Sequence, residues 1–148
     1  MATAFSINRD TGTIRIGQVG SLAANQRKVE IMPDVSDLVA GSPDHGNGYD
    51  WVDLHNLTFG GQPAMLSLCF YDDLLKEARW SVQLPNASTE GGWPTRAAID
   101  AEIAFVRRAL AEEMGIGAGT LSWGEVWSSF DPKGFLAANG LRYRPSNV

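Results

Sequence analysis

The sequence contains a single cysteine, Cys69, among its 148 residues. One cysteine cannot form an intrachain disulfide or a cysteine-based zinc site, so neither feature can stabilise this fold. A chain of this length can bury about two thirds of the surface that its unfolded form exposes, and it therefore needs no cross-links. A chain without disulfides is typical of a reducing compartment, and we expect a cytoplasmic protein.

Long hydrophobic runs are also missing. No segment reaches the roughly 18–20 apolar residues that a membrane-spanning helix requires. The first residues show no basic stretch followed by an apolar run, so we expect no signal peptide. With 44% hydrophobic and 20% charged residues, the composition is that of an ordinary globular protein. We expect one domain over 1–148 that does not enter a membrane.

Positive charge is scarce. Twelve Lys and Arg residues stand against seventeen Asp and Glu residues, which gives a formal net charge of −5. Proteins that bind nucleic acid usually present a basic surface, because phosphate neutralisation dominates their affinity. The charge therefore argues against a nucleic-acid partner and favours a cationic one.

Sequence motifs of catalysis and cofactor binding are likewise absent. There is no Gly-x-Ser-x-Gly motif of a nucleophilic serine. Cys69 stands between Leu68 and Phe70, which predicts a structural cysteine in a strand. The glycine-rich run 115–119 follows a predicted helix and lacks the Lys-Ser/Thr ending of a phosphate-binding loop, so we expect an ordinary loop and no cofactor.

Alternation of apolar and polar residues predicts three consecutive strands in the middle of the chain. The first covers 49–59, and Asp72-Asp73 forms a hairpin turn between the second and the third. A helix capped by Asp72 is the alternative for the residues up to Arg79, but unbroken alternation to Leu84 favours the strand. The inward-facing residues of the second and third strands are Ala64, Leu66, Leu68, Phe70, Ala78, Trp80, Val82 and Leu84.

One long helix is predicted from Arg96 to Met114, with Thr95 as its N-cap and Gly115 ending it. Its apolar residues recur at steps of three and four, which places them on one face. Glu102 and Glu113 flank this face, where a carboxylate either reaches water or, if partly buried, has a raised pKa. The apolar face consists of Ile99, Ile103, Val106, Leu110 and Met114.

The two ends of the chain complete the predicted fold. Short alternating segments predict strands at 13–17 and 28–32, the second ending at Pro33. Residues 121–130 and 135–143 are predicted as strands joined by a turn at 131–134, with a short helix beginning at Pro132 as the alternative for the last segment. The fold class is therefore α+β, a single domain in which the 96–114 helix packs on one face of an antiparallel sheet of about five to seven strands.

Segment 44–55 holds both histidines and several carboxylates, and it is the best candidate for chemistry. Asp53 and His55 are two residues apart on a predicted strand, so they share a face. Such a pair can orient a general base or contribute to a metal site. Zinc requires at least three protein ligands, and this pattern supplies only two. We therefore expect a solvated strand face and no bound metal.

The five tryptophans are numerous for this length. Trp80 belongs to the predicted core, Trp93 lies in a Gly-Gly-Trp-Pro loop, and Trp123 and Trp127 share one predicted strand face. Exposed tryptophans supply rigid contact area at interfaces. Trp93, Trp123 and Trp127 are thus candidate binding residues, unless the Trp123/Trp127 face packs under another element.

These observations favour a non-enzymatic protein-binding domain, such as a bacterial immunity-type inhibitor of a basic partner protein. The inference rests on the class of small acidic α+β domains and not on a motif. One alternative is a small metal-dependent or acid/base enzyme that uses Asp53 and His55. Another is a homo-oligomeric protein that binds a small ligand in an apolar pocket of its sheet.

Overall fold

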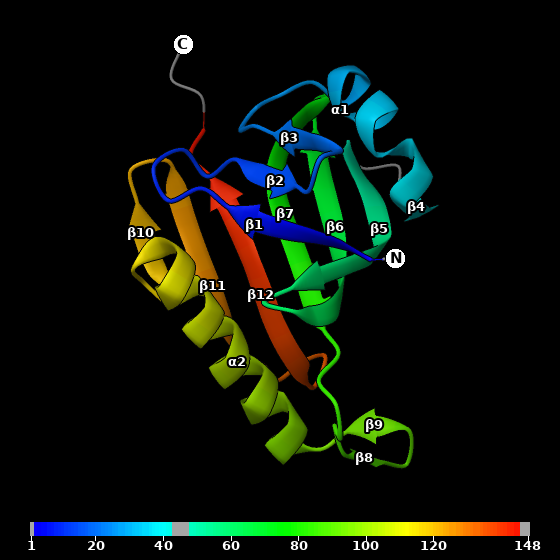
Figure 1. Ribbon diagram of the computed structural model, residues 1–148, viewed down its shortest axis with the longest axis vertical. Helices are drawn as coiled ribbons and strands as arrows, with labels where there is room; N and C mark the ends of the chain where they lie inside the picture. Colours follow the sequence, from blue (N-terminus) through cyan, green and yellow to red (C-terminus); the bar gives the residue numbers. More distant parts are fainter. Residues whose placement is uncertain (1, 43–47, 146–148) are drawn as a thin grey trace.

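The computed structural model describes residues 2–42 and 48–145. In this part of the chain, ten strands form one mixed sheet (Figure 1). Along the sheet the order is β10-β11-β12-β7-β6-β5-β1-β2-β3, and β4 also pairs with β5. The strands of this sheet are β1 (Thr3–Ile7), β2 (Ile14–Ile16), β3 (Gly20–Leu22), β4 (Val39–Gly41), β5 (Tyr49–Phe59), β6 (Gln62–Tyr71), β7 (Leu74–Val82), β10 (Gly119–Leu121), β11 (Gly124–Asp131) and β12 (Leu136–Tyr143).

The remaining elements are two α-helices, a 3-10 turn and a small hairpin. Helix α1 covers Lys28–Val35 and is followed by the 3-10 turn Ser36–Leu38. The long helix α2 covers Arg96–Met114. The hairpin pairs β8 (Thr89–Glu90) with β9 (Trp93–Pro94), and it projects beyond the end of the sheet beside the start of α2 (Figure 1).

The central strands confirm the alternation seen in the sequence. Strands β6 and β7 pair around Asp72 and Asp73, whose φ angles of +52° and +68° suit a tight hairpin turn. The strand interpretation of 72–80 is therefore confirmed over the helical one. Leu84 is half-buried, and the other predicted inward residues are buried: Ala64, Leu66, Leu68, Phe70, Ala78, Trp80 and Val82.

Helix α2 has the predicted bounds and caps. The Thr95 hydroxyl accepts a hydrogen bond from the Ala98 backbone N–H at 3.1 Å. Gly115 ends the helix in the left-handed conformation, with φ of +82°. The helix packs on β11 and β12 and buries Ile99, Val106, Leu110 and Met114, while Ile103 is half-buried.

The sheet is larger than the predicted five to seven strands, and it is not purely antiparallel. Strand β1 pairs with β5 in parallel, and β2 and β3 extend the sheet beyond it. The predicted strand at 13–17 corresponds to β2. Strands of three residues, such as β3 and β4, contain too few positions for alternation to be recognised.

The predicted strand over 28–32 is wrong, because these residues begin helix α1. Ile31 and Val35 are four residues apart, so they share one helix face, and both are fully buried. Val29, which alternation placed beside Ile31, is 60% exposed. Pro33 lies inside this short helix and does not end a strand.

The predicted strand over 121–130 is also wrong in its extent. It is divided into β10 and β11, which form a hairpin that turns at Ser122 and Trp123. The last segment is the strand β12, so the helical alternative after Pro132 does not occur.

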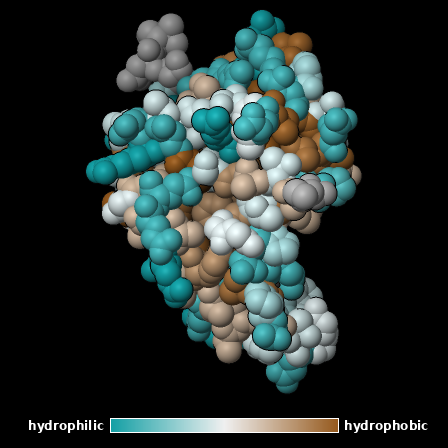
Figure 2. All heavy atoms as spheres, in the orientation of Figure 1, coloured by the Kyte–Doolittle hydropathy of each residue, from teal (hydrophilic) through white to brown (hydrophobic). Residues whose placement is uncertain are grey.

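Nearly all buried apolar side chains belong to one cluster on one face of the sheet. Ile31 of α1, Val106 of α2 and Ile16 of β2 all join this cluster. Both helices and the β1–β3 end of the sheet, which crosses over the central strands, therefore cover the same face of those strands (Figure 1). Figure 2 shows this covered side from outside, with hydrophilic residues over much of β1–β3 and α2 and apolar residues in the recess between them. Within the described ranges, neither helix is long and apolar enough to span a membrane.

Candidate protein-binding surface

The opposite face of the sheet, which we call the open face, carries the outward side chains of β5, β6, β7, β12 and β11. None of the described helices or short strands packs its apolar residues against this face, because those residues join the core on the other side. Met65 and Tyr71 on β6 are 46% and 44% exposed. Strand register places the following outward residues on the open face: Trp51, Asp53, Met65, Ser67, Tyr71, Glu77, Arg79, Ser81, Glu125, Trp127, Arg142.

A row of aromatic and charged side chains crosses the middle of the open face. Glu77 lies at its centre and accepts hydrogen bonds from Arg79 Nε at 2.5 Å and from Arg142 Nε at 2.9 Å. The Arg79 guanidinium lies 5.6 Å from the Trp51 ring, and the Arg142 guanidinium lies 5.4 Å from the Trp127 ring. We call these five residues the Trp–Arg ladder.

The ladder is ordered but remains accessible. Glu77 is only 8% exposed, whereas the side chains of Arg79 and Arg142 are 52% and 53% exposed. The hydrogen bond from Arg142 to Glu77 raises the pKa of the Arg142 guanidinium, which stays charged. Because both guanidinium groups are held by Glu77 and lie over indole rings, less side-chain entropy is lost when a partner binds them.

A glycine permits the position of Trp127. Gly140 lies opposite Trp127 in the β11–β12 ladder. A Cβ atom at Gly140 would lie 2.5 Å from the Trp127 ring, so any larger residue would displace the indole from the sheet. Trp127 therefore lies against β12 and presents its outer surface to solvent.

Cys69 lies under this surface and is 3% exposed. Its register neighbours are Trp51 on β5 and Glu77 on β7. Burial is the main cause that raises the pKa of the Cys69 thiol to about 11, and the nearby Glu77 carboxylate adds to the effect. The thiol is therefore protonated at neutral pH, which suits a structural cysteine and not a nucleophile.

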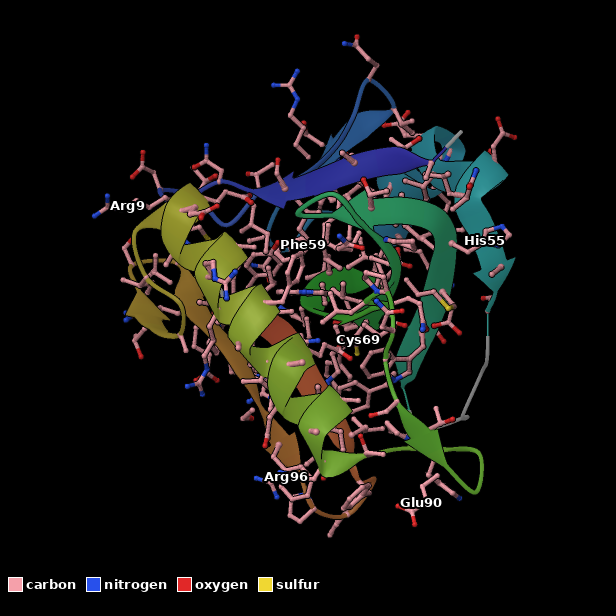
Figure 3. The ribbon with its side chains drawn as sticks, turned by 60° about the horizontal axis from the view of Figure 1, so that its bottom comes forward. Arg9, His55, Phe59, Cys69, Glu90 and Arg96 are labelled. Atoms are coloured by element: carbon pink, nitrogen blue, oxygen red, sulfur yellow. The ribbon has the colours of Figure 1, made fainter. Side chains whose placement is uncertain are left out.

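The three tryptophans predicted as binding residues lie in three different places. Trp127 belongs to the open face. Trp93 lies in the β8–β9 hairpin, where Gly91 and Gly92 form the turn with positive φ angles, and it is 63% exposed. Figure 3 shows Glu90, the partner of Trp93 in this hairpin, at the projecting end of the molecule.

Trp123 has a structural role, and the prediction that it shares a face with Trp127 is wrong. Its indole N–H donates to the Arg9 carbonyl at 2.7 Å, and its ring lies 5.7 Å from that of the buried Tyr143. A Cβ atom at Gly12 would lie 2.5 Å from the same indole. The β10–β11 turn rotates Trp123 toward the N-terminal turn, so the side chain attaches that turn to β12.

Asp53 lies on β5 inside the sheet, between β4 and β6, and His55 lies where the pairing of β5 with β6 becomes irregular. Asp53 accepts a hydrogen bond from the Ser67 hydroxyl at 2.7 Å, and His55 is exposed. Figure 3 shows His55 at the side of the molecule, away from Cys69. No group of three or more His, Cys, Asp or Glu side chains suited to a metal occurs among the described residues. Asp44 and His45 lie outside the described residues.

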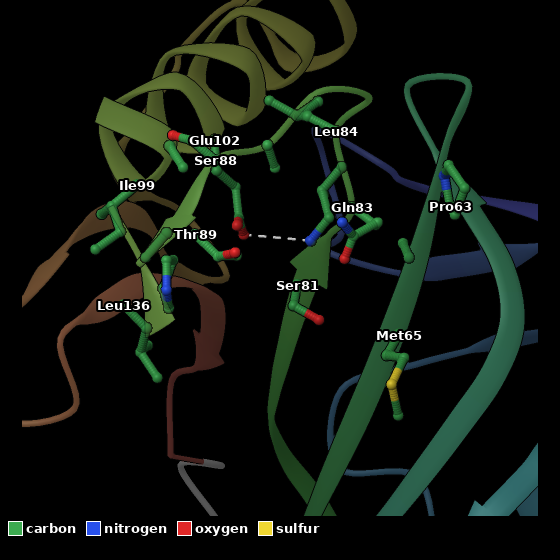
Figure 4. Close-up of a pocket in the computed structure, with 16 residues that line it drawn as sticks. Pro63, Met65, Ser81, Gln83, Leu84, Ser88, Thr89, Ile99, Glu102 and Leu136 are labelled. Atoms are coloured by element: carbon green, nitrogen blue, oxygen red, sulfur yellow. Dashed lines mark hydrogen bonds between the residues drawn. The ribbon is translucent and has the colours of Figure 1, made fainter. Parts of the chain in front are cut away.

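A groove opens where β7 and β12 separate. Their pairing runs from Glu77↔Arg142 to Trp80↔Asn139 and stops there. Beyond this point a cavity of about 470 Å³ lies between the two strands, the first turns of α2 and the segment leading to β8 (Figure 4). Glu102 reaches from α2 toward β7 at the inner side of this groove.

Polar side chains replace the strand pairing where the groove begins, at the point where β7 and β12 separate. Glu102 Oε2 accepts hydrogen bonds from the Val82 N–H at 3.2 Å and from Asn139 Nδ2 at 2.8 Å. Asn139, which is 1% exposed, also donates to the Trp80 carbonyl at 3.0 Å, and its Oδ1 accepts from the Ser128 hydroxyl at 2.6 Å. Burial raises the pKa of the Glu102 carboxyl above its ordinary 4.5, and the two hydrogen bonds offset part of the rise.

The second glutamate on the flank of α2 behaves similarly. Glu113 Oε1 accepts a hydrogen bond from the Ile7 backbone N–H and so joins α2 to β1. Desolvation raises the pKa of Glu113, and this hydrogen bond lowers it by a smaller amount. Both glutamates are thus bound to backbone N–H groups, which the sequence pattern did not predict.

Sequence reasoning missed the Trp–Arg ladder and the groove. The outward positions of β7 were correctly predicted as polar, but Glu77 and Arg142 are 65 positions apart along the chain. Their contact depends on β12 pairing with β7, and no local pattern encodes that non-sequential pairing. The only available signal was that Arg142 alternates with the apolar Leu141 and Tyr143.

The sequence matches no known family model and no curated protein. A chain of one solved structure, described as "Rhs1-CT in complex with cognate immunity protein RhsI1", is similar in fold, with a TM-score of 0.57. The two chains are 16% identical, and the match covers 96% of this chain and 87% of that chain. This protein therefore shares its overall α+β fold with a chain from a complex between an immunity protein and its cognate partner.

Proposed function

We propose that the chain is a non-enzymatic, immunity-type inhibitor that binds a partner protein through the open face of its sheet. The observation that carries the proposal is the Trp–Arg ladder, an ordered set of aromatic and charged side chains on an uncovered sheet face. Binding energy at interfaces concentrates on Trp, Tyr and Arg residues, and the ladder supplies two of these types side by side.

The aromatic residues of the open face are suited to act as anchors. Trp51 and Trp127 are half-buried, so each ring is fixed by its neighbours and still offers surface to a partner. Rigid rings lose little entropy on binding, and each arginine can form further hydrogen bonds with its free N–H groups. Trp93 on the projecting hairpin is a second anchor outside the face, whereas Trp123 is already engaged with Arg9 and Tyr143.

The net charge of −5 favours a cationic partner. A negative field accelerates the encounter with a positively charged protein, and the association rate falls as added salt screens the field. The contact energy would come from the anchors, so salt is expected to change the association rate more than the dissociation rate.

The comparison of folds supports the same proposal. The similar chain comes from a complex that contains an immunity protein, so this fold occurs in a complex of that kind. The described residues also place no third carboxylate, imidazole or thiol with Asp53 and His55 in a group that would favour the metal-dependent alternative.

The test is to identify the partner and measure neutralisation. The purified chain would be used to capture proteins from the source organism, and each captured protein would be expressed in bacteria with and without the chain. We expect one captured protein to inhibit growth alone and to be harmless in the presence of the chain. A captured set in which no protein is inhibited by the chain would contradict the proposal.

A matched pair of variants locates the interface. Trp127→Ala should weaken the complex by about 2 kcal/mol, or roughly 30-fold, mainly through faster dissociation. Val29→Ala is the control, because Val29 is 60% exposed on α1 and α1 lies on the covered side of the sheet. Equal affinities of the two variants in isothermal titration calorimetry would show that the open face is not the interface.

A further inference from the structure

The groove between β7 and β12 joins the open face to α2. Met65 and Ser81 line it, and strand register points their side chains toward the open face. Ile99 and Glu102 line it from α2, the helix whose Val106, Leu110 and Met114 join the core on the covered side of the sheet. A partner seated on the open face would therefore lie over one end of a groove whose inner side holds a carboxylate.

The charge of the groove is carried by one side chain. Among the described residues that line the cavity, Glu102 is the only ionisable one, and none of them is a lysine, arginine or histidine. Its Oε2 accepts the hydrogen bonds from Val82 and Asn139, whereas none of the described residues donates to Oε1. One oxygen of a partly buried carboxylate is thus left for a donor from outside.

The walls of the groove are apolar with a few hydroxyl groups. Leu84, Ile99 and Leu136 contribute aliphatic surface, and Ser81 and Thr89 contribute hydroxyl groups. An occupant that matches these features has an apolar stem and a cationic head with several hydrogen-bond donors. An arginine side chain has this form, since its methylene stem ends in a planar guanidinium with five N–H donors.

We propose that the groove receives an arginine side chain of the partner protein, with its guanidinium hydrogen-bonded to Glu102 Oε1. The proposal rests on the proposed function, because it assigns the partner's positive charge to a defined site. The first turn of α2 contributes a partial positive charge nearby. That charge is about half an elementary unit, which is smaller than the charge of an ionised carboxylate. Thr95 also already accepts the Ala98 N–H at this helix end.

The cavity of about 470 Å³ is larger than one side chain requires. The remaining space accommodates water that bridges the guanidinium to the wall hydroxyls, as is common at polar interfaces. Formation of the ion pair away from bulk water strengthens it, because the local dielectric constant is lower.

The test uses n-butylguanidinium as a probe and its neutral analogue n-butylurea as the control. Each is titrated into isotopically labelled protein, and the amide signals of Val82 and Ile99 are followed by NMR. We expect saturable shifts of the Val82 signal with n-butylguanidinium and at least about tenfold weaker binding of n-butylurea. Equal binding of the two probes, or an unperturbed Val82 signal, would overturn the proposal.

Two variants complete the experiment. Glu102→Gln removes the charge, and Ala98→Met places a larger side chain in the groove without touching the hydrogen bonds of Glu102. Both should weaken n-butylguanidinium binding by at least about tenfold. Unchanged binding in a folded Glu102→Gln protein would overturn the proposal. If that variant does not fold, the comparison of the two probes and the Ala98→Met variant decide the question.

Failure of this inference is distinguishable from failure of the proposed function. If the partner is neutralised by the Ala98→Met and Glu102→Gln variants as well as by the wild-type chain, the groove does not receive an arginine of the partner, and the immunity function still stands. Selective binding of n-butylguanidinium by a chain that neutralises no protein leaves a small-cation site and overturns the assignment of the arginine to a partner.

Discussion

Asn139 is the residue whose removal should test the packing of α2 on the sheet most directly. It is 1% exposed and takes part in three hydrogen bonds that join β12 to three other elements. Its amide nitrogen donates to the Trp80 carbonyl on β7 and to Glu102 on α2, and its oxygen accepts from the Ser128 hydroxyl on β11. Asn139→Ala deletes all three bonds at the point where β7 and β12 separate.

The expected loss of stability follows from the groups that remain. The Trp80 carbonyl and the Ser128 hydroxyl lose a partner in a buried region, and Glu102 keeps only the Val82 N–H. A buried polar group left without a partner costs about 1–3 kcal/mol. Two such groups, together with the hydrogen bond that Glu102 loses, should lower the free energy of unfolding by about 3–5 kcal/mol. This is a large part of the roughly 5–15 kcal/mol that stabilises a domain.

The measurement is urea unfolding followed by tryptophan fluorescence. We expect a lower midpoint with an unchanged slope, because the surface exposed on unfolding stays the same. Ser129→Ala is the control, since Ser129 is an exposed neighbour of the network on β11, and it should change stability by less than about 0.5 kcal/mol. A loss below about 1 kcal/mol for Asn139→Ala would refute the argument that this network replaces strand pairing.

Asn139→Asp should make the stability of the protein depend on pH through the same site. Two carboxyl groups would then share the site, so one of them holds a proton in the folded protein with a pKa above its unfolded value. Such a group contributes stability below the unfolded pKa that is lost as the pH rises through the folded pKa. Asn139→Asp should therefore recover stability relative to Asn139→Ala as the pH is lowered from about 7 to about 5. Parallel pH profiles of the two variants would contradict this reasoning.

Three further predictions concern other parts of the domain. Val106→Asp should unfold the protein, because an unpaired carboxylate in place of a fully buried side chain costs several kcal/mol. Circular dichroism measures this, and a folded variant as stable as the wild type would contradict the packing of α2 on the sheet. The Cys69 thiol, with its pKa raised to about 11 and 3% exposure, should react with a thiol reagent in the folded protein far more slowly than after denaturation, and equal rates would show that it is accessible. Burial raises the pKa of Glu102 above 4.5 in the folded state, so the stability of the wild-type protein should fall as the pH rises from 4.5 through the folded pKa. Glu102→Gln should flatten this part of the stability profile, and an unchanged slope would show that other groups cause the pH dependence.

The sequence predicted the elements in which periodicity is long and continuous. Helix α2 contains nineteen residues, and its apolar stripe, its N-cap and its terminal glycine all agree. The strands β6 and β7 alternate over nine or ten residues and meet at a two-residue turn. In such segments local preference and burial favour the same structure, so a single sequence is sufficient.

Short segments were predicted less well, for a physical reason. Segment 28–32 alternates for five residues, a length at which strand and helix patterns overlap. Only the docking of Ile31 and Val35 into the core favours the helix there. Trp123 shows the same limit, because a turn between β10 and β11 rotates its ring away from the face that a continuous strand would give it.

The candidate interface illustrates both sources of information. The sequence by itself determined that β7 has a polar side with Glu77 and Arg79, that β12 ends in alternating residues including Arg142, and that the chain carries excess negative charge. Only the tertiary structure decided that β12 lies beside β7, which brings Arg142 to Glu77 and leaves a groove where the two strands separate. Periodicity determines which side of a strand faces the core, whereas the choice of neighbouring strand depends on how α2 and the N-terminal strands together cover one face of the sheet.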